Sequence, residues 1–391
     1  MSAPATPVEA AASPAAGQTT WRLFAVVRPG LEPLLRAELA ELLPGRELRE
    51  LVGGLEWRGG VADLHRVARW SHLAEAIRVR VAEFSAPRFE RLVAGVERAP
   101  WHAFATASTQ IEVRATCHRS RLYHSDAVAE RVREAILARL ADRQAARPGP
   151  GKLVVHVRLH SDSCVLSVDA TGDRLHRRGY RTEVGGAPAR ETLAAAVVMA
   201  GLRAFERPDV IWDPFCGTGS LVIEAALVSA AMPPGARRGF DFELWPSCGA
   251  LPADALPRAA WAVRCVGSDI DDHALGSAGR NADRAGVGDR CGFTLLDASD
   301  AALPAEPEQR LLVCFNPPYG DRLRGAADPL RRLRERLVSR RGPTAVAMMA
   351  PTVMCEPWIF RGAQVVADVR NGGIPVRLVA WAAGHTATLG R

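Results

Sequence analysis

The sequence predicts an α/β protein in which a doubly wound, mostly parallel C-terminal sheet follows a separate α+β module. Three observations support this fold class. From about residue 207, short apolar segments alternate with helical patterns, which is typical of a parallel sheet. Residues 21–170 instead combine half-buried strands with amphipathic helices. Near the end of the chain, Asn371-Gly372-Gly373 separates two apolar runs and predicts a hairpin, so the last strands are antiparallel.

Length and composition are those of a globular protein. The chain has 391 residues, 48% hydrophobic and 24% charged, which is enough for two or three domains with apolar cores. Its apolar runs are much shorter than the roughly 20 residues that a membrane helix requires. Residues 1–20 lack the basic and apolar regions of a signal peptide. We therefore expect a cytoplasmic, membrane-free protein, a monomer by preference, with a disordered leader at 1–20.

Charge points to a polyanionic partner. The net charge is +7 and the pI is about 9.3. Of the 50 basic residues only Lys152 is a lysine. Arginine suits forked contacts with phosphates, although GC-rich codon usage would also enrich it, and both explanations stay open. The eight cysteines lie far apart without a C-x-x-C pair, so we expect neither a metal site nor a disulfide framework.

The first module is predicted from residue patterns along 21–172. In order, we expect a strand and turn at 21–30, a helix that Pro44 ends, a strand at 109–118, a helix from about Ser125, and strands at 152–160 and 164–171. These elements predict a sheet with helices on one face. The segment 114–126 interleaves cations with an aromatic ring, including Arg119, Arg121 and Tyr123. Such a segment can follow a phosphate backbone and stack on a base, but a solvated polar loop is an equal alternative.

The second half is predicted as alternating strands and helices. In order, we expect a strand at 209–212, a helix at 220–232, a strand at 262–268, a helix at 272–286, strands at 291–296 and 310–315, a basic helix at 328–340, and strands at 344–350 and on both sides of 371–373. In such a sheet, ligands bind beyond the carboxyl ends of the strands. The residues at those ends are therefore the candidates for chemistry.

Four predicted strand ends carry polar residues: Asp213, Asp269, Asp297 and Asn316. Gly217 and Gly219 follow the first of these and open a helix, so the backbone can approach a ligand closely and the helix N-terminus can receive a carboxylate. A carboxylate at the second end can hold both ribose hydroxyls, and one at the third can accept from an adenine amino group. Each acid alone could be a cap or a turn residue, but the set favours an adenosyl ligand.

A dinucleotide site is the nearest alternative. Its fingerprint requires a third glycine three positions after Gly219, where this chain has Val222. It also places its acid roughly 20 residues further on, whereas Asp269 follows Gly219 by 50 residues. An adenosyl ligand with one amino-acid carboxylate therefore fits better than a pyrophosphate.

The fourth strand end continues as Asn316-Pro317-Pro318-Tyr319. The Asn316 side-chain carbonyl and the Pro317 backbone carbonyl can both accept from a planar exocyclic amine, and the prolines hold them in place. Two acceptors draw such an amine towards tetrahedral geometry and spread its developing positive charge. Tyr319 would stack on the ring that bears the amine. A proline-rich turn alone explains the prolines but not their place at this strand end.

The assembled motifs "DPFCGTGS", "GSDID" and "FNPPYG" resemble class I S-adenosylmethionine-dependent amino-methyltransferases. Together with residues 176–198 and 234–246, they look like the THUMP-containing RNA guanine-N2 methyltransferases. The resemblance implies a ferredoxin-like part at 21–75, a THUMP-like RNA-binding domain at 76–172 and a Rossmann-like methyltransferase domain at 173–391. Some large members carry a second methyltransferase domain that this sequence lacks, so we expect one modification.

Carried over by position, the resemblance implies roles for individual residues. Asp213, Cys216, Gly217 and Gly219 would surround the methionine end of S-adenosylmethionine, Asp269 its ribose and Asp297 its adenine. Asn316, Pro317, Pro318 and Tyr319 would receive the guanine. Arg178 and Arg181 would contact RNA or roof the cofactor pocket, with Tyr180 and Arg190.

The resemblance implies methylation of a guanine N2 in structured RNA, with 23S ribosomal RNA favoured over tRNA. Two other functions stay open. DNA adenine and protein glutamine methyltransferases share the Asn-Pro-Pro-Tyr sequence, but they need no RNA-binding module. A non-catalytic RNA-binding or ribosome-assembly factor could also be built on this fold. Binding of S-adenosylmethionine would distinguish an enzyme from such a factor.

Overall fold

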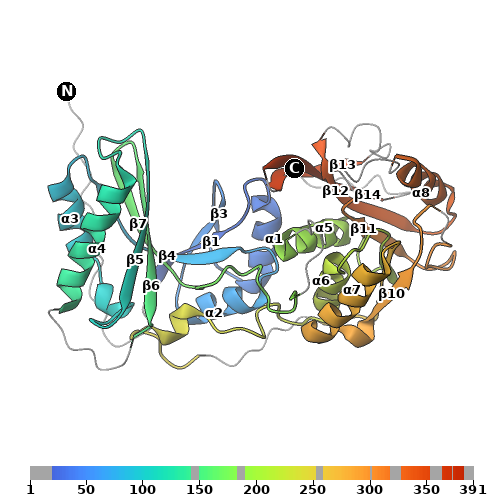
Figure 1. Cartoon of the computed structure of the whole chain (residues 1–391), viewed down its shortest axis with the longest axis horizontal. Coiled ribbons are helices and arrows are strands. Elements are labelled where there is room, and N and C mark those ends of the chain that lie inside the picture. Colours follow the sequence, from blue (N-terminus) through green and yellow to red (C-terminus); the bar gives the residue numbers. More distant parts are fainter. Residues whose placement is uncertain are drawn as a thin grey trace.

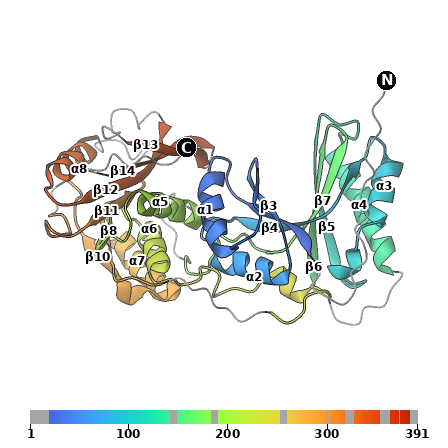
Figure 2. The ribbon, with the colours of Figure 1, turned by 180° about the vertical axis from the view of Figure 1, so that it is seen from behind.

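The computed structural model describes residues 20–141, 149–182, 190–251, 259–299, 302–317, 327–352, 363–371 and 373–382. These residues form two seven-stranded sheets. Figures 1 and 2 show an elongated molecule, in which the first sheet occupies one end and the middle and the second sheet occupies the other end. The predicted leader lies almost entirely outside the described residues.

The first sheet and its helices make up the N-terminal module. Its strands run in the order β2 (Arg49–Leu51), β3 (Gly54–Gly59), β1 (Trp21–Val26), β4 (Ala76–Ser85), β7 (Ser163–Asp169), β6 (Lys152–His160) and β5 (Gln110–His118). Strands β5 and β6 pair in parallel, and the other neighbours pair antiparallel. The helices are α1 (Glu32–Leu42), α2 (Val61–Trp70), α3 (Phe89–Glu97), η1 (Trp101–Ala103) and α4 (Ser125–Ala141).

The two faces of this sheet differ in polarity. Successive side chains of a strand point to opposite faces of the sheet, so alternating apolar and polar residues place the apolar side chains on one face and the polar ones on the other. One face is apolar and packs with α1 to α4 into the core, and Leu23, Val79 and Val155 on it are fully buried. The other face is polar, and we call it the polar sheet face. A bulge between Arg80 and Ala82 shifts the alternation along β4.

The second sheet is mostly parallel. Its strands run in the order β10 (Cys291–Leu295), β9 (Arg264–Asp269), β8 (Val210–Asp213), β11 (Leu311–Phe315), β12 (Thr344–Pro351), β14 (Ile374–Ala382) and β13 (Gln364–Asn371). Strand β14 is antiparallel to both of its neighbours. The helices are α5 (Glu191–Ala204), α6 (Ser220–Ser229), η2 (Asp241–Leu244), α7 (Asp272–Ala285), η3 (Gly288–Arg290) and α8 (Ala327–Ser339). After β10 the chain returns to the other side of β8, so the topological switch point lies between β8 and β11.

A segment of the second half, residues 232–248, reaches across to the N-terminal module, and we call it the strap. Figure 1 shows it in yellow below the first sheet. Trp245 is 2% exposed, and its ring centroid lies 5.9 Å from that of Trp21 and 4.9 Å from that of Phe104. The Gly235 N–H donates to the Arg69 carbonyl at 2.9 Å, and a Cβ at residue 235 would meet that carbonyl oxygen at the same distance. The strap thus fixes the two halves of the molecule against each other.

The predicted fold class is confirmed: the described residues form an α+β module with helices on one face, followed by a mostly parallel sheet with antiparallel strands at its end. Strands β13 and β14, before and after residue 372, pair antiparallel as predicted. Helix α5 was not predicted, because ten of its fourteen residues are buried and the sequence therefore lacks an amphipathic pattern. The proposed boundary between residues 75 and 76 stays a prediction, and β4 pairs with strands on both sides of it.

Candidate active site

The four polar strand ends lie at one edge of the second sheet. Asp213 ends β8, Asp269 ends β9, and Asn316 follows β11 directly. Asp297 comes two residues after the end of β10. Because these four strands are parallel neighbours, their carboxyl ends share an edge on both sides of the switch point. In a doubly wound sheet, ligands bind at this edge.

The glycine-rich loop between β8 and α6 is held by its neighbour β9. The Gly217 N–H donates to Asp269 Oδ2 at 2.8 Å, and the Cys216 N–H donates to the Ser268 carbonyl at 3.0 Å. Gly219 has φ +83° and caps α6, and a Cβ there would meet the Ala278 Cβ at 2.9 Å. A residue other than glycine would therefore be strained at 219 and would push the loop away from α7.

Among the acids at this edge, Asp213 has the pKa that is shifted furthest from its ordinary value. Its side chain lies in the interior at 2% exposure, and its Oδ1 accepts from the Phe215 N–H at 3.0 Å. Its Oδ2 is buried without a hydrogen-bond partner in the described structure. Burial raises the pKa of Asp213 to about 8, and the nearby Asp269 charge adds to the effect. A cation or a donor brought to this carboxylate would stabilise its ionised form.

Further unpaired polar atoms gather at the same edge. Buried side-chain atoms without a hydrogen-bond partner among the described residues include Thr218 Oγ1 and Ser220 Oγ of the glycine-rich loop, and Asn316 Oδ1. Buried polar groups are normally paired, so such a group of open atoms marks a place where a polar ligand completes the bonding. Pro317 is buried beside Asn316. Pro318 and Tyr319, predicted to receive the base, lie outside the described residues.

The remaining predicted cofactor residues sit at the outer side of this edge. Asp297 is exposed, and its Oδ1 accepts from both the N–H and the hydroxyl of Ser299 at 2.7 Å, which lowers its pKa. Asp269 also accepts from the Asp271 N–H at 3.1 Å. Ile270, next to it, is 74% exposed. Both acids thus remain partly accessible.

An adenosyl ligand with an amino-acid end fits these residues. The glycines provide close backbone approach, the open Asp213 oxygen suits an amino group, and the accessible Asp269 suits ribose hydroxyls. Within the part of the chain that the structure describes, no group of three or more His, Cys, Asp or Glu side chains could hold a metal ion. No helix of the described residues is long and apolar enough to cross a membrane.

Asn281 of α7 also shapes the site and was missed by the sequence analysis. It is fully buried, and its Nδ2 donates to the Thr218 carbonyl at 3.2 Å, which holds the glycine-rich loop from behind. Arg284 donates to the Asn281 Oδ1 at 2.9 Å. A polar asparagine on the buried face of the amphipathic helix 272–286 was the available signal.

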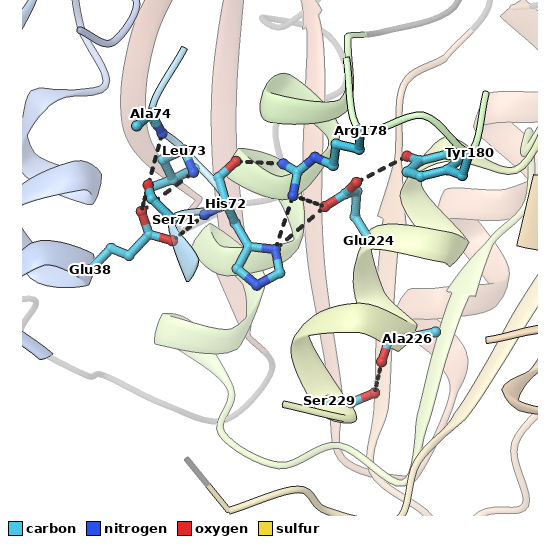
Figure 3. A network of polar contacts seen from close by, with 10 residues as sticks. All are labelled: Glu38, Ser71, His72, Leu73, Ala74, Arg178, Tyr180, Glu224, Ala226 and Ser229. Atoms are coloured by element: carbon cyan, nitrogen blue, oxygen red, sulfur yellow. Dashed lines mark hydrogen bonds and ion pairs between the residues drawn. The ribbon is translucent and has the colours of Figure 1, made fainter. Parts of the chain in front are cut away.

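Arg178 does not occupy the position expected for an RNA-binding residue. It is 2% exposed, and its Nη1 lies 3.2 Å from Glu224 Oε2 of α6. Its Nη2 donates to the His72 carbonyl at 2.7 Å, and the Tyr180 hydroxyl donates to the same Glu224 at 2.9 Å (Figure 3). Arg181 is 15% exposed and forms an ion pair with Glu191 at 3.5 Å. The prediction of RNA contact is thus wrong for Arg178, because the residue is sealed in the interior.

This buried cluster continues into the N-terminal module. Glu38 of α1 accepts from the Ser71 hydroxyl at 2.5 Å and from the His72 N–H at 2.6 Å. Figure 3 shows Glu38, the turn at 71–74, Arg178 and Glu224 in one connected network. Burial raises the pKa of Glu224, and the Arg178 charge opposes that effect. The network joins α1 to α6, the helix that starts at the glycine-rich loop.

The other predicted RNA-binding residues are exposed and close together in the chain after β5. Tyr123 is 69% exposed, with its ring centroid 4.1 Å from that of His124. The Arg121 side chain is 72% exposed, and its backbone N–H donates to Asp162 Oδ1 at 2.8 Å. Arg119 is exposed and has φ +51°. Their surface position is compatible with contact to RNA, which stays a prediction.

Three family descriptions match consecutive parts of this chain. Residues 22–78 match the RlmL ferredoxin-like domain, residues 86–169 the THUMP domain, and residues 178–351 the RMKL-like methyltransferase domain. Together with the polar strand ends at the switch point, they define the class: a methyltransferase domain joined to a ferredoxin-like and THUMP module. The chain thus contains an RMKL-like methyltransferase domain that follows a ferredoxin-like domain and a THUMP domain.

Curated proteins are similar to this chain in sequence. The ribosomal RNA large subunit methyltransferase K/L of Syntrophotalea carbinolica is 37% identical over 334 residues, which are 80% of this chain and 46% of that protein. The chain spans about half the length of the curated relatives it matches.

Solved structures share the whole fold. The crystal structure of the methyltransferase candidate SMU.472, complexed with SAH, has a TM-score of 0.78 and 26% identity, covering 93% of this chain and 98% of that one. A predicted N6-adenine-specific DNA methylase from Listeria monocytogenes has a TM-score of 0.76 and 27% identity, covering 92% and 96%.

Proposed function

We propose that this protein transfers a methyl group from S-adenosylmethionine to the exocyclic N2 amine of a guanine in ribosomal RNA. The observation that carries the proposal is the set of open buried atoms at one sheet edge, with Asp213 Oδ2 on one side of the switch point and Asn316 Oδ1 on the other. One is suited to the amino-acid end of the donor, and the other to an acceptor amine. This substrate implies a cytoplasmic location.

The residues of the glycine-rich loop would hold the donor. Asp213, Cys216, Gly217 and Gly219 would surround its methionine end, Asp269 would accept from the ribose hydroxyls, and Asp297 from the adenine amine. S-adenosylmethionine supplies an electrophilic methyl carbon on a positively charged sulfur. The structure of a relative complexed with SAH, the demethylated product, supports this choice of donor.

The acceptor residues would activate a weak nucleophile. The lone pair of the guanine N2 amine is delocalised into the ring, so the free amine attacks poorly. The Asn316 Oδ1 and the Pro317 carbonyl would each accept one amine hydrogen and would stabilise the positive charge that develops on nitrogen. The carbon–sulfur bond of the donor would break as the nitrogen–carbon bond forms, so that SAH leaves. The methylated nitrogen would then be acidic enough to lose its proton to water, so no strong base is required. Tyr319 would stack on the guanine.

RNA as the substrate is supported by the names of the relatives and by the THUMP match. Guanine N2 lies at the minor-groove edge of a paired base, so the target must be unpaired or flipped out. The N-terminal module would supply affinity mainly through phosphates, and binding should weaken steeply with salt. A flat response to salt would remove its RNA-binding role.

The test is to incubate the protein with methyl-labelled S-adenosylmethionine and three substrates: unmodified large-subunit ribosomal RNA, unmodified tRNA and duplex DNA. The labelled nucleoside is then identified after digestion. We expect N2-methylguanosine in ribosomal RNA. Label in N6-methyladenine of DNA, as the name of the Listeria neighbour suggests for that protein, would overturn the proposal. Donor binding without transfer to any substrate would favour the ribosome-assembly alternative.

A further inference from the structure

The polar sheet face carries a mostly basic row of side chains that crosses six of the seven strands of the first sheet. Cross-strand pairing places Arg58 of β3 next to Arg22 of β1, and Arg22 next to Arg80 of β4. The row continues from Arg80 through Ser167 of β7 and His156 of β6 to Arg114 of β5. Neighbouring strands lie about 4.8 Å apart, so these six positions span about 24 Å.

Acids at the base of the face hold some of these arginines in place. Glu56 is 7% exposed and lies 2.7 Å from Arg80 Nε and 3.2 Å from Arg22 Nη2. Glu112 lies 2.6 Å from Arg114 Nε. The arginine heads are therefore oriented before any ligand arrives, which lowers the entropic cost of binding.

Positive charge nevertheless remains in excess on this face. Arg58, Arg78 and Arg158 form no ion pair within the part of the chain that the structure describes, and Arg58 and Arg158 are exposed. Burial lowers the pKa of Arg78, the Asp169 charge opposes that effect, and the neighbouring cations Arg174, Arg80 and Arg114 add to it. Crowded guanidinium groups repel one another, so an anion that bridges them would be bound favourably.

The row adjoins the exposed loop that follows β5. His118 ends β5 four positions after Arg114, and its ring stacks on that of His160 with centroids 5.1 Å apart. Arg119, Arg121 and Tyr123 follow at once. The polar sheet face and this loop thus form one continuous surface, opposite the face that packs against α1 to α4.

We propose that the polar sheet face is an RNA-binding surface on which Arg58, Arg78 and Arg158 contact phosphates, extending the contacts of the loop at 119–123 across the ferredoxin-like half. The proposal rests on the proposed function, because that function supplies the RNA. Forked guanidinium groups suit phosphate oxygens, and their spread over several strands suits an extended backbone better than a single small anion.

The test compares two double variants of equal charge change. Arg58→Glu with Arg158→Glu reverses two exposed cations on the polar sheet face. Arg91→Glu with Arg133→Glu reverses two exposed cations on α3 and α4, on the opposite side of the sheet. Affinity for protein-free large-subunit ribosomal RNA is measured against salt, and SAH affinity serves as the control for folding.

We expect the first pair to weaken RNA binding at least tenfold and to reduce the slope of log affinity against log salt by about 2, since each lost phosphate contact removes about 1. The control pair should stay within about threefold of wild type, because its cations contact no phosphate. Equal losses in both pairs would overturn the proposal, as would wild-type affinity in the first pair.

Ultraviolet crosslinking of RNA to the unaltered protein provides a second readout. Crosslinked peptides from β3, β4 and β6 are expected, because these strands carry Arg58, Arg78 and Arg158. Crosslinks confined to other elements would contradict the surface, and so would binding of an acidic protein in place of RNA. Failure of the proposed function would look different. Wild type would then bind RNA with the same dependence on Arg58 and Arg158, yet transfer no methyl group to it.

Discussion

The Arg178 guanidinium lies 3.2 Å from the Glu224 carboxylate, and both side chains are shut off from solvent at 2% and 0% exposure. Arg178 lies between the two sheets in sequence, whereas Glu224 belongs to the helix behind the glycine-rich loop. The His72 ring lies within 3.5 Å of both, at the edge of the N-terminal module. Stability and the alignment of the two halves therefore depend on the same ion pair.

Removing one member of this pair should be costly. Glu224→Ala leaves Arg178 as an uncompensated buried charge, so we expect the free energy of unfolding to fall by about 3–5 kcal/mol. Denaturant titration followed by circular dichroism measures it. The double variant Arg178→Met with Glu224→Leu should recover most of the loss, because it leaves no buried charge. A double variant as unstable as the single one would contradict this account.

Asp213 should make stability depend on pH. Its pKa is about 8 in the fold, against roughly 3.9 in an unfolded chain. Between these values the folded state keeps a proton that the unfolded chain has lost. The stabilisation is therefore complete below about pH 4 and is lost as pH rises through about 8. Asp213→Asn cannot ionise, so its free energy of unfolding relative to wild type should increase from pH 6 to 8.

The measurement is urea denaturation of both proteins without S-adenosylmethionine at pH 6, 7, 8 and 9. The difference between them should grow up to about pH 8 and level off above it. A difference that stays constant over this range would mean that Asp213 is already ionised at pH 6.

Asn316→Ala should separate chemistry from donor binding. Loss of one preorganised acceptor should lower kcat by about two to three powers of ten. Affinity for SAH, measured by calorimetry, should stay unchanged because Asn316 is assigned to the acceptor base. Full activity in this variant would dispose of the amine-activating role.

Asp269→Ala should instead weaken binding of the donor. Its carboxylate accepts from the Gly217 N–H at 2.8 Å and is assigned to the ribose hydroxyls, so both the loop and the ligand lose a partner. We expect SAH affinity to fall by at least tenfold, in line with loss of hydrogen bonds to a charged group. Unaltered affinity would show that the ribose assignment is wrong.

Trp245 of the strap should contribute strongly to stability, because its buried ring packs against residues of the N-terminal module. Trp245→Ala opens a cavity between Trp21 and Phe104, so we expect a loss of about 3–5 kcal/mol in the free energy of unfolding. Trp245→Phe is the matched control, because it keeps an aromatic ring at the junction. Similar stability of the alanine and phenylalanine variants would argue against the packing role.

Residue patterns predicted the sheet edge of the active site but not its support. Asp213 and Asp269 end strands and Asn316 follows one directly, and these strands are predicted from short apolar runs. Parallel strands bring their carboxyl ends to the same edge of the sheet. Asn281 holds the same loop from a helix 63 positions beyond the carbonyl it contacts, and no local rule relates such distant residues.

Arg178 shows where reasoning from sequence fails. The family resemblance implied that Arg178 contacts RNA or roofs the cofactor pocket, and charged residues are rarely buried without a partner. The partner, Glu224, stands 46 positions later as a single acid in the apolar helix 220–229, and only the fold brings the two together. Helix α5 was missed for a related reason, since burial on all sides removes the periodicity that marks a helix.

The strap also limits how evolution or an engineer could recombine this protein. Phe242 and Trp245 are encoded in the C-terminal half, yet they fill space between residues of the N-terminal half. In a chimera that takes residues 20–172 from a distant homologue, the strap of this protein would have to pack against an N-terminal module whose side chains differ from its own. Exchange of the two halves should succeed only when residues 232–248 are taken from the same protein as the N-terminal module.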